Sequence, residues 1–310
     1  MLFPPIPCCT RTRTGIVLLV VLFLVLILGM VILQFGIMVQ YEKKIAQNSA
    51  DSLEASYIIQ SKLETAKTAI LNTTGLTSRT EPGETEGTES PDSALSGVVI
   101  TDASSRININ HIVDTKDKVN TDVMEAVENL FTQTRIEPNI SVKIIDCIDR
   151  NNKPYDTKGS ESGSLNRPFQ NLTELGIIEG IPPELLQKNR KDGQPVLDDF
   201  LTVFSRGRIN INTAPREVLN AIIKNRAYEK TVSGIIEQRQ IKPFKSVREI
   251  YEVPGVSSGM FFDYFKDRLT TVPSVFIVDV EAQVGRVTSR ARAVFEKRGK
   301  AVHMLFFRKE

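Results

Sequence analysis

Apolar residues form one unbroken run near the N-terminus. The run covers residues 16–33, and only Gln34 interrupts its continuation to Val39. A helix of this length crosses roughly 30 Å of hydrocarbon. A cleaved secretory signal fits less well, because its apolar region would hold roughly 7–15 residues and would end in a small-residue cleavage site. We therefore predict one spanning helix, with the short N-terminal leader in the cytoplasm.

Beyond the span, residues 41–71 keep apolar side chains at helical spacing with polar residues between them. The pattern predicts an amphipathic helix that joins the span as one helix of about 55 residues. Residues 72–96 are then rich in Thr, Gly, Ser, Pro and Glu, a composition that cannot bury enough apolar surface to offset the entropy of ordering. We interpret this stretch as a flexible acidic linker with no function of its own.

Strand patterns lie at the two ends of the remaining chain. Residues 98–100 are β-branched, and residues 275–284, 286–296 and 302–307 alternate or cluster apolar positions around turn residues. This pattern predicts a first strand followed, much later, by three antiparallel strands.

The pentapeptide Arg-Ile-Asn-Ile-Asn occurs twice, at 106–110 and 208–212. Such self-similarity indicates a duplicated unit. Period-two alternation puts the isoleucines on one face and the asparagines on the other, at a strand-to-helix turn. We expect the asparagines to bond exposed backbone groups rather than a ligand. In the second copy, Thr213 is the expected N-cap of the following helix.

A second repeated block begins with Pro168-Phe169 and with Pro243-Phe244. Asn171 with Glu174 and Ser246 with Glu249 have capping-box spacing, so each block should begin a helix with the phenylalanine packed beneath it. The second unit resembles a tandem helix-hairpin-helix domain, a family that often binds nucleic acid.

Nucleic-acid binding is nevertheless not favoured. The hairpin binds phosphate through backbone N–H groups of a Gly-hydrophobic-Gly turn. Here Pro182 and Ser257 replace the second glycine, and proline has no N–H to donate. Residues 206–271 hold twelve Lys and Arg against seven Asp and Glu, a surplus that is also ordinary for a solvated surface.

Composition gives little support for an enzyme. The net charge is +2, and the chain has three cysteines and two histidines. His111 and His303 are too far apart in the sequence for a persuasive catalytic or zinc constellation. Cys8 and Cys9 precede the span, which leaves Cys147 without a disulfide partner in the exported part.

Acidic side chains between the two repeated blocks suggest a metal site. These are Asp146, Asp149, Asp156 and Glu161, hard oxygen ligands on a turn-rich stretch that could hold Ca²⁺, although solvated loop carboxylates are the commoner case.

Together, these segments resemble the general secretion pathway protein K family, the large minor pseudopilins of bacterial type II secretion. The resemblance rests on residues 102–110, 144–149, 159–162 and 209–215 and on both Pro-Phe blocks. This sequence departs from the family pattern at Cys147, where tryptophan is usual, and in the acidic linker.

The resemblance implies a leader cut by the prepilin peptidase between Gly15 and Ile16, with methylation of Ile16. It also implies an inner-membrane, single-pass protein with a periplasmic C-terminal domain. The fifth mature residue is Val20, where most pilins carry glutamate, and this fits a subunit at the filament tip. Implied partners are the minor pseudopilins I and J and the major pseudopilin. The family also makes calcium binding more plausible.

We thus expect an α+β fold in which a small antiparallel pilin-like sheet follows the pilin helix and carries a large all-α insertion of two helix-hairpin-helix or SAM-like subdomains. The expected parts are a leader at 1–15, the helix at 16–71, the linker at 72–96, a first subdomain at 97–205, a second at 206–271 and the terminal strands at 272–310. The chain is expected to be a non-enzymatic filament subunit, and the alternative is a membrane-anchored DNA-binding receptor of DNA uptake.

Overall fold

The computed structural model describes residues 14–72, 97–151, 153–157, 159, 163–186, 196–223, 229–253, 256 and 265–309. Residues 1–13 of the expected leader and residues 73–96 of the expected linker lie outside the described residues. The chain forms two compact units, which are described separately below. One comprises Met1–Tyr57 with Gln283–Thr288, and the other comprises Ile58–Ala282 with Ser289–Glu310.

The first unit is built on helix α1, Thr14–Asn72, which continues into the second unit. The sequence predicted this single helix to within two residues at each end. In the first unit, Gly285 has a φ of 55° and its missing Cβ would lie 2.6 Å from Oδ2 of Asp51. Gln47 Nε2 donates to Asp51 Oδ1 over 2.7 Å. The positive φ and this close approach both favour glycine at the turn of the hairpin.

The second unit contains a four-stranded sheet in the order β1-β6-β7-β8. The strands are β1 Val98–Asp102, β6 Val275–Val284, β7 Val287–Arg298 and β8 Ala301–Lys309. β1 pairs antiparallel with β6, and β7 pairs antiparallel with β8. Phe276, Val278, Val280 and Ala282 in β6 are all buried, as predicted, but the burial alternates only in the second half of the strand, because Val275 and Ile277 on the opposite face are buried too.

The last part of α1 belongs to the same unit as the sheet. Ile59, Leu63, Ala66 and Ile70 are buried there. Lys297 on β7 donates through Nζ to the carbonyl oxygens of the helix end, at 3.0 Å from Ile70 O. This last part of the helix thus packs on the sheet through its apolar side, as its spacing indicated.

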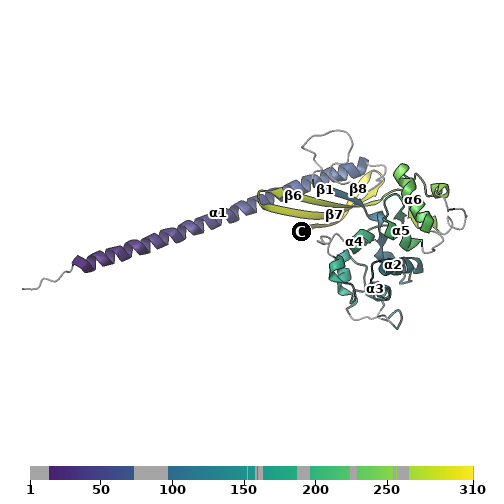
Figure 1. The fold of residues 1–310 in the computed structure, drawn as a ribbon, viewed down its shortest axis with the longest axis horizontal. Helices are drawn as coiled ribbons and strands as arrows, with labels where there is room; N and C mark the ends of the chain where they lie inside the picture. The colour runs from purple at the N-terminus through teal and green to yellow at the C-terminus, as the bar shows by residue number, and fades with distance from the viewer. Residues whose placement is uncertain are drawn as a thin grey trace, which may run out of the picture. The chain divides into compact units, whose positions relative to one another are not determined.

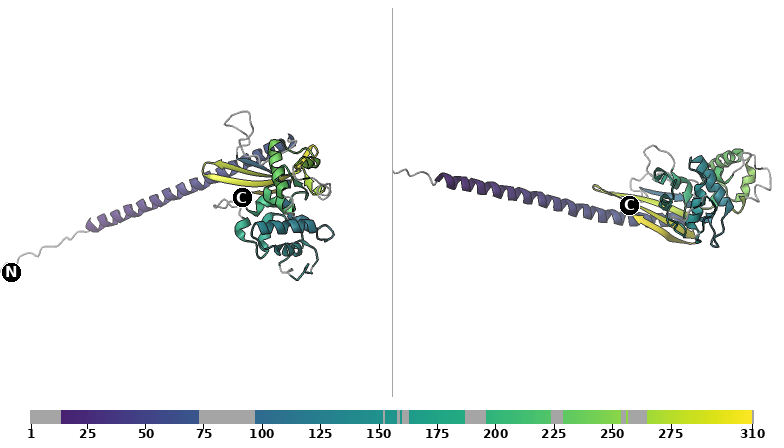
Figure 2. Two further views of the ribbon diagram at one scale, coloured as in Figure 1. Left: turned by 45° about the vertical axis from the view of Figure 1, so that its right-hand side comes forward. Right: turned by 90° about the horizontal axis from the view of Figure 1, so that it is seen from below.

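The remaining elements of this unit lie between β1 and β6 in the sequence, and in both ribbon views the longer helices gather toward one end of the sheet (Figures 1 and 2). The α-helices are α2 Thr121–Gln133, α3 Ile140–Ile148, α4 Leu197–Phe200, α5 Arg216–Ile222 and α6 Glu229–Ile241. The 3-10 helices are η1 Ala103–Ser105, η2 Ile109–Ile112, η3 Leu172–Ile177, η4 Pro183–Leu186 and η6 Val247–Glu252.

The two copies of the repeat fold into two similar units, here called frames, each of which contains a pair of short parallel strands. In the first, β2 Ile107–Asn108 pairs in parallel with β3 Leu201–Thr202; in the second, β4 Ile209–Asn210 pairs in parallel with β5 Leu269–Thr270. The first long helices of the two copies, α2 and α5, pack against each other. One continuous apolar core runs through both copies and includes Phe169 and Phe244.

Several local predictions were wrong. Thr213 does not cap α5, because Pro215 occupies the N-cap position and the Thr213 hydroxyl bonds to Asp102 instead. Asn171 and Ser246 make no side-chain cap bond, and the elements that follow are 3-10 rather than α-helices.

The glutamates of the two blocks have a different role from the one predicted. Glu174 Oε2 accepts from the backbone N–H of Gln170 over 3.0 Å, and Glu249 Oε2 accepts from Lys245 over 3.0 Å. Each carboxylate therefore binds the residue that follows the repeated phenylalanine, one residue before the predicted cap.

Candidate functional site

The first candidate surface is the N-terminal part of α1. Every large apolar side chain from Ile16 to Val39 is exposed. Within the described residues, one helix, α1, is long and apolar enough to cross a membrane by length and composition, and the candidate span within it begins at Ile16. Val20 lies in this exposed stretch. An exposed apolar helix of this kind requires lipid or other apolar helices around it.

The repeated asparagines are the second candidate. Asn212 accepts from the Phe244 N–H through Oδ1 and donates through Nδ2 to the Phe244 carbonyl, both at 2.9 Å. Asn110 forms the same pair with Phe169, at 2.8 and 2.9 Å. Each amide also donates to a chain segment just after the paired strand, Val203 O in the first copy and Thr271 O in the second.

The other two asparagines of the repeat close the turn itself. Asn108 Oδ1 accepts from the Asn110 N–H over 3.0 Å, and Asn210 Oδ1 accepts from the Asn212 N–H over 3.1 Å. All four amides are therefore occupied inside the fold. The prediction that these asparagines serve the backbone rather than a ligand is confirmed.

Asp102 joins the end of β1 to the second copy. Its Oδ2 accepts from Asn210 Nδ2 and from Thr213 Oγ1, each over 2.7 Å, and its Oδ1 accepts from the Ser104 N–H over 2.7 Å. Burial raises the pKa of this carboxyl above its ordinary value, against the opposing effect of these hydrogen bonds. Sequence reasoning missed this contact, because its partners are more than one hundred residues away in the chain.

A partly buried ion network joins β7 to the first copy. Arg292 binds Asp198 through Nη2 at 2.9 Å and Asp279 through Nε at 2.7 Å. Arg106 reaches the same Asp198 at 3.3 Å. Burial lowers the pKa of Arg106, whereas for Arg292 the effect of burial is outweighed by Asp198 and Asp279, which raise its pKa. In the sequence, the only residue of this network that stands out is Arg106, because it is the first residue of the repeated pentapeptide.

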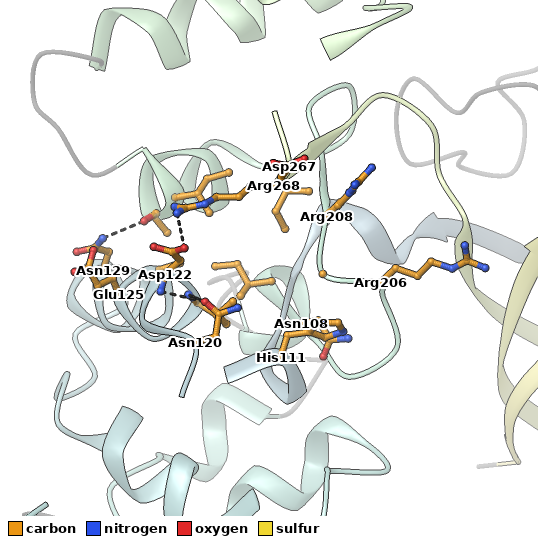
Figure 3. A pocket seen from close by; sticks show the side chains of 17 residues that line it. Asn108, His111, Asn120, Asp122, Glu125, Asn129, Arg206, Arg208, Asp267 and Arg268 are labelled. Atoms are coloured by element: carbon orange, nitrogen blue, oxygen red, sulfur yellow. Dashed lines mark hydrogen bonds and ion pairs between the residues drawn. The ribbon is translucent and has the colours of Figure 1, made fainter. Parts of the chain in front are cut away.

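A cavity of about 260 Å³ lies at the seam between the two copies and is shown in Figure 3. Its wall includes α2, α5 and both repeated strands. Arg268 forms an ion pair with Asp122 across it, and Asn129 Nδ2 donates to the Ala221 carbonyl over 3.0 Å. Arg206, another lining residue, binds Glu296.

The charges around this cavity are balanced. The acidic lining residues are Asp122, Glu125 and Asp267, and the basic ones are Arg206, Arg208 and Arg268. Since the numbers are equal and two of the arginines already bind carboxylates, the cavity does not select an anion.

The proposed calcium ligands are only partly brought together. Asp146 and Asp149 lie at the end of α3 and are buried, whereas Asp156 is exposed on the following loop and Glu161 lies outside the described residues. Oδ1 of Asp146 accepts from the Tyr155 N–H over 2.7 Å, and its Oδ2 has no hydrogen-bond partner among the described residues. Among all the residues that the structure describes, no group of three or more His, Cys, Asp and Glu side chains is arranged to hold a metal ion.

The first hairpin turn is unsuited to phosphate. Gly180 has a φ of 102°, but the next backbone N–H, that of Ile181, donates to the Ile178 carbonyl over 3.3 Å, and Ile181 is buried. Pro182 follows it and has no N–H. The corresponding Gly255 and Ser257 of the second copy lie outside the described residues.

Comparison with known proteins gives a consistent picture. Residues 105–191 and residues 209–271 each match a family model described as type II secretion system (T2SS), protein K. The two matched segments correspond to the two copies of the repeat. No curated protein matches the chain.

A solved structure has a similar fold. The match is to a chain of the GspK-GspI-GspJ complex of the type 2 secretion system from enterotoxigenic Escherichia coli, with a TM-score of 0.60. The sequence identity is 15%, and the match covers 87% of this chain and 98% of that one.

Proposed function

We propose that this chain, which belongs to the type II secretion system protein K family and is a minor pseudopilin, assembles at the tip of the periplasmic pseudopilus. The observation that carries this proposal is the exposed apolar stretch of α1 joined to a pilin-like sheet with a large helical insertion. The apolar helix would anchor the protein in the bacterial inner membrane and later pack among the helices of the filament. The two frames are further proposed to be helix-hairpin-helix-like modules that serve assembly.

Val20 supports the tip position. A carboxylate in the apolar bundle costs several kcal/mol unless it has a partner. A subunit with no neighbour above it offers no such partner, and an apolar residue is then the more stable choice. The inserted helices would also obstruct the stacking of a further subunit.

Processing by the prepilin peptidase would separate Gly15 from Ile16, and Ile16 would then be N-methylated. Mass spectrometry of the chain purified from bacterial membranes tests both steps. The expected mature chain begins at methylated Ile16. A chain that still begins at Met1 would refute filament entry by this route, and a control Gly15→Val variant should retain the leader.

Partners are proposed from the similar structure. That structure is a complex of GspK with GspI and GspJ. We expect this chain to bind the corresponding minor pseudopilins I and J and to join the major pseudopilin. Co-purification of these proteins with the tagged full chain is the test, and its failure in membranes that contain all of them would contradict the proposal.

Calcium is a proposed ligand of the loop after α3. The buried Oδ2 of Asp146 fits a cation, because it has no hydrogen-bond partner among the described residues and a buried carboxylate oxygen is stabilised by a bound cation. Asp146 and Asp149 would hold the ion, with Asp156 and Glu161 as the other candidates. Titration calorimetry of the full chain with Ca²⁺ should show heat that Asp149→Ala removes and the exposed Asp117→Ala retains. Absence of heat in the unaltered chain would end the idea.

DNA uptake is the less supported alternative. The Ile181 N–H is used within the fold, and the cavity between the copies has balanced charge. Salt-sensitive retention of duplex DNA by the full chain in a filter-binding assay would favour the alternative.

A further inference from the structure

Arg239 on α6 is half-buried and has no carboxylate partner among the described residues. Four other arginines in that part of the chain are buried or half-buried. Each of these forms an ion pair: Arg106 and Arg292 with Asp198, Arg167 with Glu174, and Arg268 with Asp122. The Arg239 guanidinium instead donates through Nη1 to two carbonyl oxygens, that of Ile211 at 2.8 Å and that of Ala214 at 2.7 Å.

These two hydrogen bonds hold the Arg239 side chain in place but do not neutralise its charge. They join α6 to the turn that precedes α5, and they use a single nitrogen of the guanidinium. Within the described residues, the Nε and Nη2 donors have no acceptor. Burial lowers the pKa of Arg239, because the positive charge is partly removed from water. A cation in this setting is stabilised by an anion that comes to it.

A second arginine acts on the same site. Arg216, the first residue of α5, is exposed, and its Nη1 donates to Ser233 Oγ on α6 over 3.0 Å. Helices α5 and α6 pack against each other (Figure 1). The charge of Arg216 is close enough to lower the pKa of Arg239 further. The carboxylates nearest to them in the sequence, Glu217 and Glu237, form no ion pair with either arginine.

Two neighbouring guanidinium groups with unused N–H donors suit a single oxyanion. Their planar donors match the two oxygens of a carboxylate or the oxygens of a phosphate. A nucleic-acid backbone would need several such sites in a row, because its affinity is the sum of many phosphate contacts. One carboxylate of a protein needs only one site of this kind, and arginine is enriched where proteins bind each other.

We infer that Arg216 and Arg239 together bind a carboxylate side chain of a neighbouring pseudopilin. The two carbonyl oxygens already hold Arg239 in position, so its side chain loses little conformational entropy on binding. Arg216 is more exposed and supplies the second charge. This inference rests on the proposed function, because it names a contact by which the subunit meets its partner.

Carbodiimide cross-linking tests the contact in bacterial membranes that contain the full chain and the secretion pseudopilins. The reagent joins a carboxylate to an amine that touches it, with loss of water, and does not join a carboxylate to a guanidinium. Arg216→Lys therefore places a reactive amine at the site and keeps the positive charge. Arg248→Lys is the matched control, since Arg248 is exposed on η6 in the same frame. Mass spectrometry should identify a bond from position 216 to an Asp or Glu of a pseudopilin, and none from position 248.

Co-purification of pseudopilins with the tagged full chain measures what the charge contributes. Arg216→Gln should reduce the recovered pseudopilin about tenfold at low salt, whereas Arg248→Gln should leave it unchanged. Added salt should reduce this difference, because it screens exposed charges. Pulse proteolysis establishes that each variant is folded. Arg216 is the residue to replace, because a change at Arg239 would also remove its bonds to the two carbonyl oxygens.

Several results would overturn the inference. A bond from position 216 to a second copy of this chain would assign the site to self-association. Protection by inorganic phosphate that Arg216→Gln abolishes, without a cross-link to a pseudopilin, would assign the site to a free anion. Salt-sensitive retention of duplex DNA that Arg216→Gln abolishes would assign it to nucleic acid.

The remaining results separate this inference from the proposed function. Pseudopilins that co-purify equally with the unaltered chain and with Arg216→Gln would overturn the inference, with or without a cross-link, and leave the proposed function intact. Failure of the unaltered chain to co-purify any pseudopilin would refute the proposed function as well.

Discussion

Replacing Asn212 by alanine removes the side chain that holds the second frame together. The amide makes two bonds to the Phe244 backbone at 2.9 Å and one to the Thr271 carbonyl at 3.2 Å. Asn212 and Phe244 are both buried. Alanine therefore leaves one N–H and two carbonyl groups without this partner in the core.

The expected loss follows from these groups. An unsatisfied buried polar group costs about 1–3 kcal/mol, and some relaxation will recover part of the total. We expect Asn212→Ala to lower the free energy of unfolding by about 3–5 kcal/mol. Asn110→Ala is the matched control, because Asn110 makes the same three bonds but is only half-buried. Water can replace its bonds in part, and its loss should be about 1–2 kcal/mol.

Urea-dependent pulse proteolysis of the full chain in detergent measures both losses. It is preferable to intrinsic fluorescence because the chain has no tryptophan. If Asn212→Ala lowers the free energy of unfolding by less than about 1 kcal/mol, or by no more than Asn110→Ala does, the hydrogen bonds of the Asn212 amide do not stabilise the second frame as the geometry indicates.

Three further outcomes are expected. Asp198→Asn removes the carboxylate that binds Arg106 and Arg292 and should cost about 3–5 kcal/mol by pulse proteolysis, whereas Glu281→Gln, in the exposed pair with Arg290, should cost less than about 1 kcal/mol. Gly180→Ala should cost more than Gly299→Ala in the same assay, since both have positive φ but only at Gly180 would the new Cβ lie 2.9 Å from Ile140. The free energy of unfolding of the wild type should fall relative to that of Asp102→Asn as the pH rises from about 3.8 through the higher pKa of Asp102 in the folded protein. The reason is that the folded protein holds the proton of the Asp102 carboxyl more tightly than the unfolded chain does. A difference between the two proteins that does not change with pH would contradict the raised pKa.

The sequence predicted the elements whose pattern is long and regular. Helix α1 and strand β6 follow directly from their apolar spacing. The role of Asn110 and Asn212 followed from turn chemistry, because an amide can satisfy a donor and an acceptor at once.

The failed predictions share a physical cause. Thr213 has a side chain suited to an N-cap, but tertiary structure brings Asp102 within 2.7 Å and the hydroxyl bonds there. Glu174 and Glu249 have capping-box spacing, but a tighter 3-10 turn places each carboxylate one residue earlier. Local spacing does not encode these choices, because the competing partners are set by packing.

The way in which the two frames are attached to the sheet makes the insertion rigid. Asp102, at the end of β1, directly precedes the first frame but bonds to the second through Asn210 and Thr213. Arg292, on β7, follows the second frame but bonds to the first through Asp198. Each frame is thus held to the strand that is more distant from it in the sequence. A swing of either frame about its own connecting strand would break a buried polar contact, at a cost of about 3 kcal/mol or more. Because these contacts hold the inserted helices to the sheet, a partner that contacted both would not have to spend free energy on ordering them relative to each other.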